Sequence, residues 1–105
     1  MSENNSMTEA LSKVKMALRV TTDAFDDEIL DLMESALIDL NIAEVNGEQA
    51  LITDPLVRLA VITYCRLHFG EPDDFDRLKL SYDEQKAQLS MATGYTVWIP
   101  ETEDF

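Results

Sequence analysis

The segment from Asp54 to Gly70 most constrains how this chain can fold, because its pattern is helical and it is apolar on nearly every side. Asp54 is a good N-cap residue, and Pro55 suits the first helical position, where its missing N–H has no intrahelical partner. Gly70 readily adopts the left-handed conformation that ends a helix. The sequence therefore predicts a helix over residues 55–69 that other segments must cover from more than one direction.

A helical projection of this segment separates two sides. The predicted inner side holds Leu56, Ala60, Thr63, Tyr64 and Leu67, with Val57, Val61 and His68 beside them. A narrow opposite strip holds Arg58, Ile62, Cys65, Arg66 and Phe69. Arg58, Ile62 and Arg66 on this strip are candidate contacts with a partner or with a neighbouring copy of the chain.

Three more helices are predicted from apolar residues at helical spacing. The first covers residues 7–19, after a short disordered start at residues 1–5, and a capping box from Ser6 to Glu9 precedes it. The second covers residues 23–41 and the last covers residues 73–92. Each carries a core stripe on one face. In the last helix this stripe is formed by Phe75, Leu78, Tyr82 and Leu89, and Thr93-Gly94 should end the helix.

The ends of these helices are marked less clearly than those of the central one. Thr22 or Asp23 is the predicted cap of the second helix, and Asn41 or the residues just after it should end that helix. Between the second and central helices, Asn46-Gly47 favours a loop or a small hairpin within residues 42–54.

The predicted fold is therefore all-α, a bundle of about four helices around a central apolar helix. At 105 residues and 46% hydrophobic, the chain fits one small domain over residues 6–94 with a tail at 95–105. A domain of this size buries roughly 65% of the surface that its unfolded chain exposes, so apolar area remains uncovered. Self-association is expected for that reason.

Charge is the strongest compositional signal, with a formal net charge of -13. No basic residue lies between Val20 and Val57, whereas carboxylates are dense there. Such a surface disfavours nucleic-acid binding, which needs clustered Lys and Arg. It is either a solubilising face or a partner face, for which the candidates on the second helix are Asp26, Asp27, Asp31, Glu34 and Asp39.

The sequence offers little for catalysis, metals or cofactors. Cys65 and His68 lie three residues apart, but the chain has no other Cys or His to complete a metal site. The segment from Asp73 to Glu84 has the length of a calcium loop, yet Leu78 stands where that loop requires Gly. The chain is therefore expected to be non-enzymatic and without cofactor. No apolar stretch reaches the ~18 residues of a membrane span, so a soluble cytoplasmic protein is expected.

The C-terminal segment begins apolar and ends acidic. It carries the candidate contact residues Tyr95, Val97, Trp98, Ile99 and Phe105. Aromatic anchors beside charges are typical of docking segments, although the same rings could instead cover the domain's own core.

Several local patterns together resemble a known family. These are Val14 to Val20 followed by Asp26 to Ile29, Ser35-Ala36, Asp54 to Val57 leading to Ala60-Val61 and Tyr64, Phe69-Gly70 before an acidic turn, Leu80 to Asp83 with Lys86 and Leu89, and Gly94-Tyr95. From about Leu11 to Tyr95 the chain resembles the head-tail connectors, or head-completion adaptors, of long-tailed bacteriophages.

This resemblance implies a structural virion protein, made in the bacterial host cytoplasm, that forms a ring adaptor between portal and tail. The implied partners are further copies matched to the portal's symmetry, the portal protein and a tail-side completion protein. DNA would pass through an acidic channel without specific binding. The alternative is an acidic helical binding module, such as a DNA mimic that occupies the basic site of a host protein. Size-exclusion chromatography with light scattering separates a ring former from a monomeric mimic.

Overall fold

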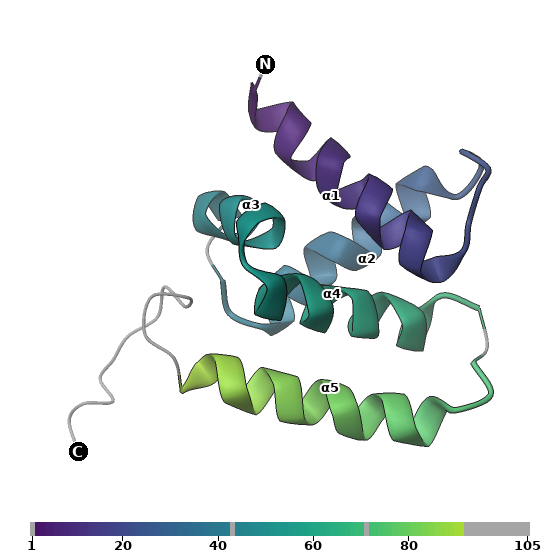
Figure 1. Cartoon of the computed structure of the whole chain (residues 1–105), viewed down its shortest axis with the longest axis vertical. Helices are drawn as coiled ribbons and strands as arrows, with labels where there is room; N and C mark the ends of the chain where they lie inside the picture. The colour runs from purple at the N-terminus through teal and green to yellow at the C-terminus, as the bar shows by residue number, and fades with distance from the viewer. Residues whose placement is uncertain (1, 43, 71, 92–105) are drawn as a thin grey trace.

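The computed structural model describes residues 2–42, 44–70 and 72–91, and in residues 2–6 and 44–46 it describes the backbone alone. Within these ranges the protein consists of helices and connecting turns, without a strand. The helices, in chain order, are α1 (Ser2–Leu18), α2 (Asp26–Asp39), α3 (Glu44–Thr53), α4 (Pro55–His68) and α5 (Phe75–Ser90) (Figure 1). The prediction of an all-α bundle around a central helix is confirmed.

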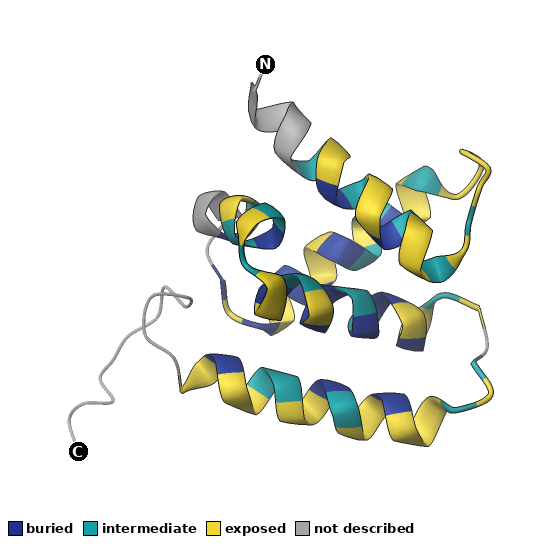
Figure 2. Ribbon diagram, viewed as in Figure 1, coloured by how far each residue is buried: buried dark blue, intermediate teal, exposed yellow. Residues whose placement is uncertain are grey.

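Helix α4 is the centre of the bundle because it packs against each of the other four helices (Figure 1). Helix α5 runs alongside it at one edge, and α2 lies behind the other helices in this view. The largest fully buried side chains come from four helices, which shows that one core joins them (Figure 2). They are Val14, Ile29, Met33, Leu51, Val57, Val61 and Cys65.

The ends of α4 form as the sequence predicts. Asp54 Oδ1 accepts hydrogen bonds from the backbone N–H of Leu56 at 2.8 Å and of Val57 at 3.4 Å, and Pro55 occupies the first turn. Gly70 has a φ of +79°, which other L-residues adopt at a cost, so the chain turns away immediately after the helix.

The buried side of α4 is broader than predicted. Ala60, Thr63 and Leu67 are buried as expected, but Cys65, which the projection placed on the polar strip, is also buried. Leu56, placed on the inner side, is 45% exposed. The physical reason is that helices pack on α4 from several directions, so the buried arc extends past the single face that a helical projection assigns.

The segment between α2 and α4 is a helix, so the prediction of a loop or hairpin over residues 42–54 is wrong. Asn-Gly marks a turn in many sequences, but here Gly47 lies inside α3 and is buried. A Cβ at Gly47 would lie 3.1 Å from Ile42 Cγ2 and 3.5 Å from Leu37 Cδ1. The missing side chain therefore allows α3 to approach the end of α2 closely.

Helix α1 begins at Ser2, so the prediction of disordered residues 1–5 and a start near Met7 does not hold for residues 2–5. Those residues contain no Pro or Gly, so the helix continues through them and Ser6 lies within it rather than capping it. At the other end, Arg19 has a φ of 63°, and Val20 N–H donates to Lys15 O at 2.9 Å. Together with the hydrogen bond that Arg19 N–H donates to Met16 O at 3.1 Å, this bond forms a Schellman motif without glycine.

Helix α2 begins three residues later than predicted, and its last residue, Asp39, lies two residues before the predicted bound. Phe25 is its N-cap residue and packs edge-on against Phe69 at 5.5 Å between ring centroids, whereas Thr22 Oγ1 accepts from Ala24 N–H in the preceding turn. The expected cap by Thr22 or Asp23 is therefore wrong, because these residues shape the turn instead. Asn41, with a φ of 63°, ends the helix as predicted.

Of the predicted stripe, helix α5 buries Leu78, Tyr82 and Leu89 against α4. Phe75, the first predicted member, is 44% exposed, so its placement in the stripe is wrong. The predicted stop of α5 at Thr93-Gly94 lies outside the described residues.

The burial of α4 yields a stability test. Ala60 is completely buried, so Ala60→Phe should overpack the core and lower the free energy of unfolding by about 1–3 kcal/mol. The matched control is Leu59→Phe one residue earlier, where the side chain is 52% exposed and the change should be within about 0.5 kcal/mol. Urea unfolding followed by circular dichroism measures both, and equal effects would show that the buried side is misassigned.

Candidate functional site

The described residues do not assemble a metal centre. No group of three or more His, Cys, Asp or Glu side chains in these ranges could hold a metal ion. Burial raises the pKa of the Cys65 thiol to about 12, so it stays protonated and unreactive at neutral pH, and His68 lies exposed against the Tyr64 ring. No helix in the described part of the chain is long and apolar enough to cross a membrane.

Three of the five predicted acidic residues form an exposed strip on α2. Asp27, Asp31 and Glu34 are spaced four and three residues apart, which places them on one side of the helix. Among the described residues, no basic side chain forms a salt bridge with any of these three. Ile38, 74% exposed, continues the strip at the C-terminal end of α2. We refer to Asp27, Asp31, Glu34 and Ile38 as the acidic strip.

The other two predicted acidic residues bind neighbouring helices. Lys15 Nζ lies 2.7 Å from Asp26 Oδ1 and 3.0 Å from Asp23 Oδ1, and these contacts join α1 to the start of α2. The hydrogen bond with Asp26, followed by that with Asp23, raises the pKa of Lys15.

Asp39 joins the end of α2 to α5. The Tyr82 hydroxyl donates to Asp39 Oδ2 at 2.6 Å, and Lys86 Nζ lies 3.3 Å from the same oxygen. The Tyr82 hydrogen bond is the main cause that lowers the pKa of Asp39, and Lys86 lowers it further. Burial, together with the Asp39 charge, raises the pKa of Tyr82. Asp39 is therefore a structural contact in this molecule.

The predicted strip on α4 also divides into two roles. The Arg58 guanidinium is half-buried and donates to the backbone oxygen of Ile52 at 2.7 Å, so it stabilises the C-terminal end of α3. Ile62 is half-buried, and Arg66 is exposed. Leu59, 52% exposed, lies on the same side as both because it is three residues from Ile62 and seven from Arg66.

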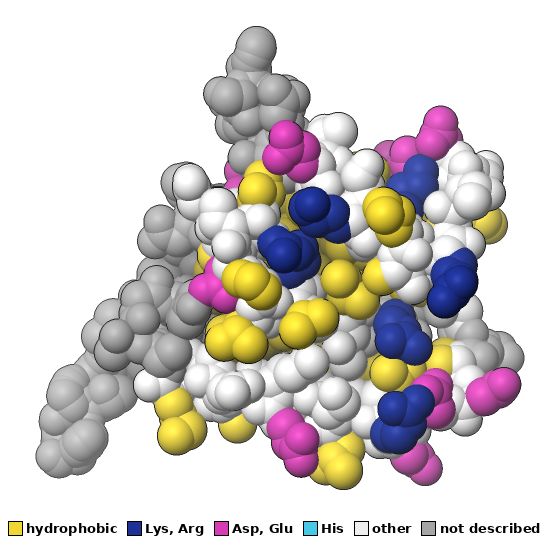
Figure 3. Space-filling view, viewed as in Figure 1, with side chains coloured by type: hydrophobic (Ala, Val, Ile, Leu, Met, Phe, Trp, Pro, Cys, Tyr) yellow, Lys and Arg dark blue, Asp and Glu magenta, His cyan; other side chains and the backbone are white. Residues whose placement is uncertain are grey.

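On the face shown in Figure 3, hydrophobic side chains gather over α3 and α4, and Lys and Arg side chains lie over α1 and along the right-hand edge. The sequence projection missed Leu59 as part of this surface, because leucine at a helical position beside the core is normally buried. The exposed neighbours Leu56 and Leu59 are the signal that an uncovered apolar surface exists here.

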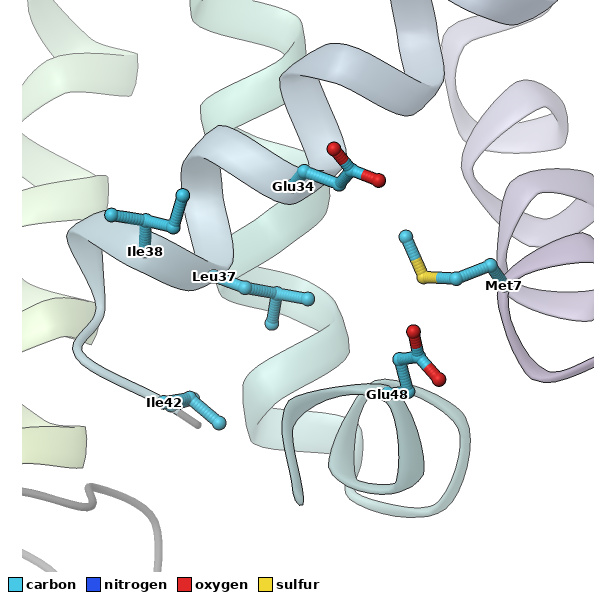
Figure 4. Close-up of a pocket in the computed structure, with 6 residues that line it drawn as sticks. All are labelled: Met7, Glu34, Leu37, Ile38, Ile42 and Glu48. Atoms are coloured by element: carbon cyan, nitrogen blue, oxygen red, sulfur yellow. The ribbon is translucent and has the colours of Figure 1, made fainter. Parts of the chain in front are cut away.

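Two hollows adjoin these surfaces. The acidic pocket, about 380 Å³, is lined by Met7 of α1, Glu34, Leu37 and Ile38 of α2, Ile42, and Glu48 of α3. Figure 4 shows the carboxylates of Glu34 and Glu48 extending from two different helices toward the space beside Met7. The pocket thus has apolar walls and two carboxylates at its edge.

The basic pocket, about 260 Å³, lies between the C-terminal ends of α1 and α4 and the start of α5. Its lining consists of Ala17, Leu18, Arg19, Arg66, Phe69, Pro72, Asp74 and Leu78. The Asp74 carboxylate pairs with Arg77, so the two arginines set the charge of this pocket.

The predicted contact residues of the C-terminal segment, namely Tyr95, Val97, Trp98, Ile99 and Phe105, lie outside the described residues. Their role stays a prediction.

Comparison with known families gives a match over residues 10–96 to a family model described as phage connector protein. The chain belongs to this family. The resemblance inferred from the sequence is confirmed, and the match covers every helix from α2 to α5 and the second half of α1. No curated protein and no solved structure matches the chain. As a phage connector, the protein is a structural component of the virion that acts in joining head and tail.

The contact between Tyr82 and Asp39 predicts a pH-dependent effect on the connector's stability. Tyr82→Phe should lower the free energy of unfolding by about 1 kcal/mol at pH 7, because Asp39 loses the hydrogen bond from Tyr82 and keeps only the contact with Lys86. The matched control is Tyr64→Phe, whose ring packs against Tyr82.

The pH dependence of this stability difference follows from the directions of the two pKa shifts. The pKa of Asp39 is lowered from its ordinary value of 3.8, so the ionised carboxylate stabilises the fold at neutral pH. This contribution is lost as pH falls through the folded-state pKa. The pKa of Tyr82 is raised from its ordinary value of 10.0, so the protonated hydroxyl stabilises the fold below pH 10. This contribution is lost as pH rises further. Denaturant unfolding at pH 3, 7 and 10.5 should show the largest difference between wild type and Tyr82→Phe at pH 7. A difference that is equal at pH 3 would contradict the role given to the hydrogen bond.

Proposed function

We propose that the protein is a ring-forming adaptor between the portal and the tail, which completes the DNA-filled head and continues the DNA channel. The observation that carries this proposal is the connector-family match over residues 10–96. The described surfaces support it in two ways, through the acidic strip and through the exposed apolar side chains.

The acidic strip suits the wall of a DNA channel. Asp27, Asp31 and Glu34 are exposed and form no salt bridge with the described basic residues, so their charges act outward. Carboxylates repel phosphates, and a wall that cannot neutralise phosphate groups cannot hold DNA in place. DNA would therefore move past this surface without adhering.

The exposed apolar side chains suit contacts with further subunits. Leu59, Leu80 and Ile38 are each more than half exposed, so their side chains are available for contacts with other subunits. Neighbouring copies, the portal protein on one side and a tail-side completion protein on the other would cover such side chains. We assign Tyr95, Val97, Trp98, Ile99 and Phe105 to the attachment of the ring to the portal, with the acidic end of the chain setting the register.

A DNA mimic remains the second candidate, because the acidic strip would also fit a basic groove on a host protein. The two functions differ in oligomeric state and in partner. A mimic acts as a monomer on a basic host protein, whereas an adaptor assembles with copies of itself and with the portal.

The acidic strip predicts that the protein does not bind duplex DNA at ~150 mM salt, since it lacks the clustered cations that displace counterions. A gel-shift assay at micromolar protein should show no retention. The triple variant Asp27→Lys, Asp31→Lys, Glu34→Lys is the matched control and should retain DNA, because it replaces the strip with clustered positive charge. Retention by the wild-type protein would count against a channel role.

Deletion of Val97 to Phe105 tests the assignment of the C-terminal segment. Because the described helices share a hydrophobic core of their own, the truncated protein should keep its helix content and melting temperature. It should lose co-purification with the portal protein of the phage that encodes it, measured by affinity capture and by electron microscopy of the complex.

Two results would contradict this assignment. Unfolding of the truncated protein would show that the segment belongs to the protein's own core. Full assembly of the truncated protein on the portal would show that the segment is dispensable. If the full-length protein also fails to bind the portal and remains monomeric, the adaptor proposal itself is wrong.

A further inference from the structure

The acidic pocket and the basic pocket lie at opposite ends of helix α1. Met7, near the start of α1, lines the acidic pocket, and Ala17 and Leu18, at its end, line the basic pocket. At 1.5 Å per residue, eleven residues separate the two sites by on the order of 16 Å along the helix. The molecule therefore presents hollows of opposite charge on separate surfaces.

The basic pocket holds arginines that the fold itself does not use. Four basic side chains pair with aspartates, namely Lys15, Arg77, Lys79 and Lys86. Arg58 donates to a backbone oxygen. Among the described residues this leaves Lys13, Arg19 and Arg66 without an acidic partner, and the last two line the same pocket. Phe69 and Leu18 give that pocket apolar walls.

The acidic pocket has the complementary chemistry. Glu34 and Glu48 extend toward one space from α2 and α3, and neither forms a salt bridge within the described residues (Figure 4). Met7 and Leu37 form apolar walls beside them. Such a hollow suits an arginine, whose aliphatic stem packs on apolar surface while its planar head binds carboxylates through two hydrogen bonds.

We infer that the occupant of the acidic pocket is the Arg19 and Arg66 end of a second copy of this chain. This inference rests on the proposed function in one respect, that copies of the protein assemble with one another. Each copy carries a net charge of -13, so two copies repel unless opposite charges meet locally. The basic pocket supplies two of the three basic side chains that remain without an acidic partner among the described residues.

The contact joins two different surfaces and is therefore heterologous. It places Glu34 between two copies, so that Asp27 and Asp31, which do not line the acidic pocket, are the carboxylates of the acidic strip left to face DNA. Each copy would receive the basic end of one neighbour and present its own basic end to the next, and a repeated contact of this kind closes into a ring when its rotation permits. The chain's own C-terminal segment is a poorer occupant, because Glu101, Glu103 and Asp104 would bring negative charge to an acidic pocket.

The inference is tested by exchanging the charges of the two ends. One variant carries Glu34→Arg and Glu48→Arg, and the other carries Arg19→Glu and Arg66→Glu. Light scattering and analytical ultracentrifugation should show that each variant alone loses the assembly that the wild-type protein forms. An equimolar mixture should regain it, because both contacts are again complementary when the variants alternate. Lys13→Glu is the matched control, since Lys13 lines neither pocket, and it should assemble like the wild type.

Disulfide trapping provides a second readout for a weak contact. Glu34→Cys and Arg66→Cys are prepared separately in a Cys65→Ala background, mixed and oxidised at high concentration. The mixed dimer should form in excess over either symmetric dimer. Circular dichroism of each variant verifies that it is folded.

Several results would overturn the inference, and they are distinguishable from failure of the proposed function. If the wild type and both charge variants assemble equally, the contact is wrong but ring formation stands. Equal or greater trapping of symmetric dimers would show a different interface. If the wild-type protein remains monomeric and no mixed dimer is trapped, both this contact and unaided ring formation are wrong. If a basic peptide binds the acidic pocket while Arg19→Glu and Arg66→Glu leave assembly unchanged, the pocket is a binding site for another protein.

Discussion

The burial of α4 is the constraint on which the rest of the structure depends. A helix that is apolar over most of its circumference is stable in water only when other helices cover it on several sides, and α1, α2, α3 and α5 all pack against it. Asp54 fixes where this helix begins and Gly70 fixes where the chain leaves it. The remaining helices therefore expose only their outer faces and ends, and the candidate surfaces are found there.

The sequence predicts the features that are set locally. The caps of α4, the stripe of Leu78, Tyr82 and Leu89, and the end of α2 at Asn41 depend on residues close in the chain, and all of them are confirmed. Helix α3 was missed because the signal at Gly47 is ambiguous. The same residue that favours a tight turn also permits close helix packing, and only the positions of Leu37 and Ile42 distinguish the two.

The candidate surfaces were predictable in composition but not in detail. All five acidic residues proposed on α2 lie on or next to that helix, yet Asp39 is bound by Tyr82, which is 43 residues away in the chain. Arg58 likewise binds the end of α3, a helix that the sequence did not predict. Whether a charged residue stabilises the fold or remains available to a partner depends on such tertiary contacts, and no local pattern encodes them.

The distribution of the remaining charges follows from this division. Carboxylates at the two ends of α2 bind Lys15, Tyr82 and Lys86. The two lysines are therefore not available to a partner. Few cations remain, and two of them, Arg19 and Arg66, lie together beside Phe69 at the C-terminal end of α1. Glu34 and Glu48 lie near the other end of that helix, beside Met7. Among the described residues, the two arginines without an acidic or backbone partner lie in one hollow, which suits that region to approach the negative surface of another copy. The same excess of carboxylates that would keep DNA from adhering would thereby also restrict how the subunits meet.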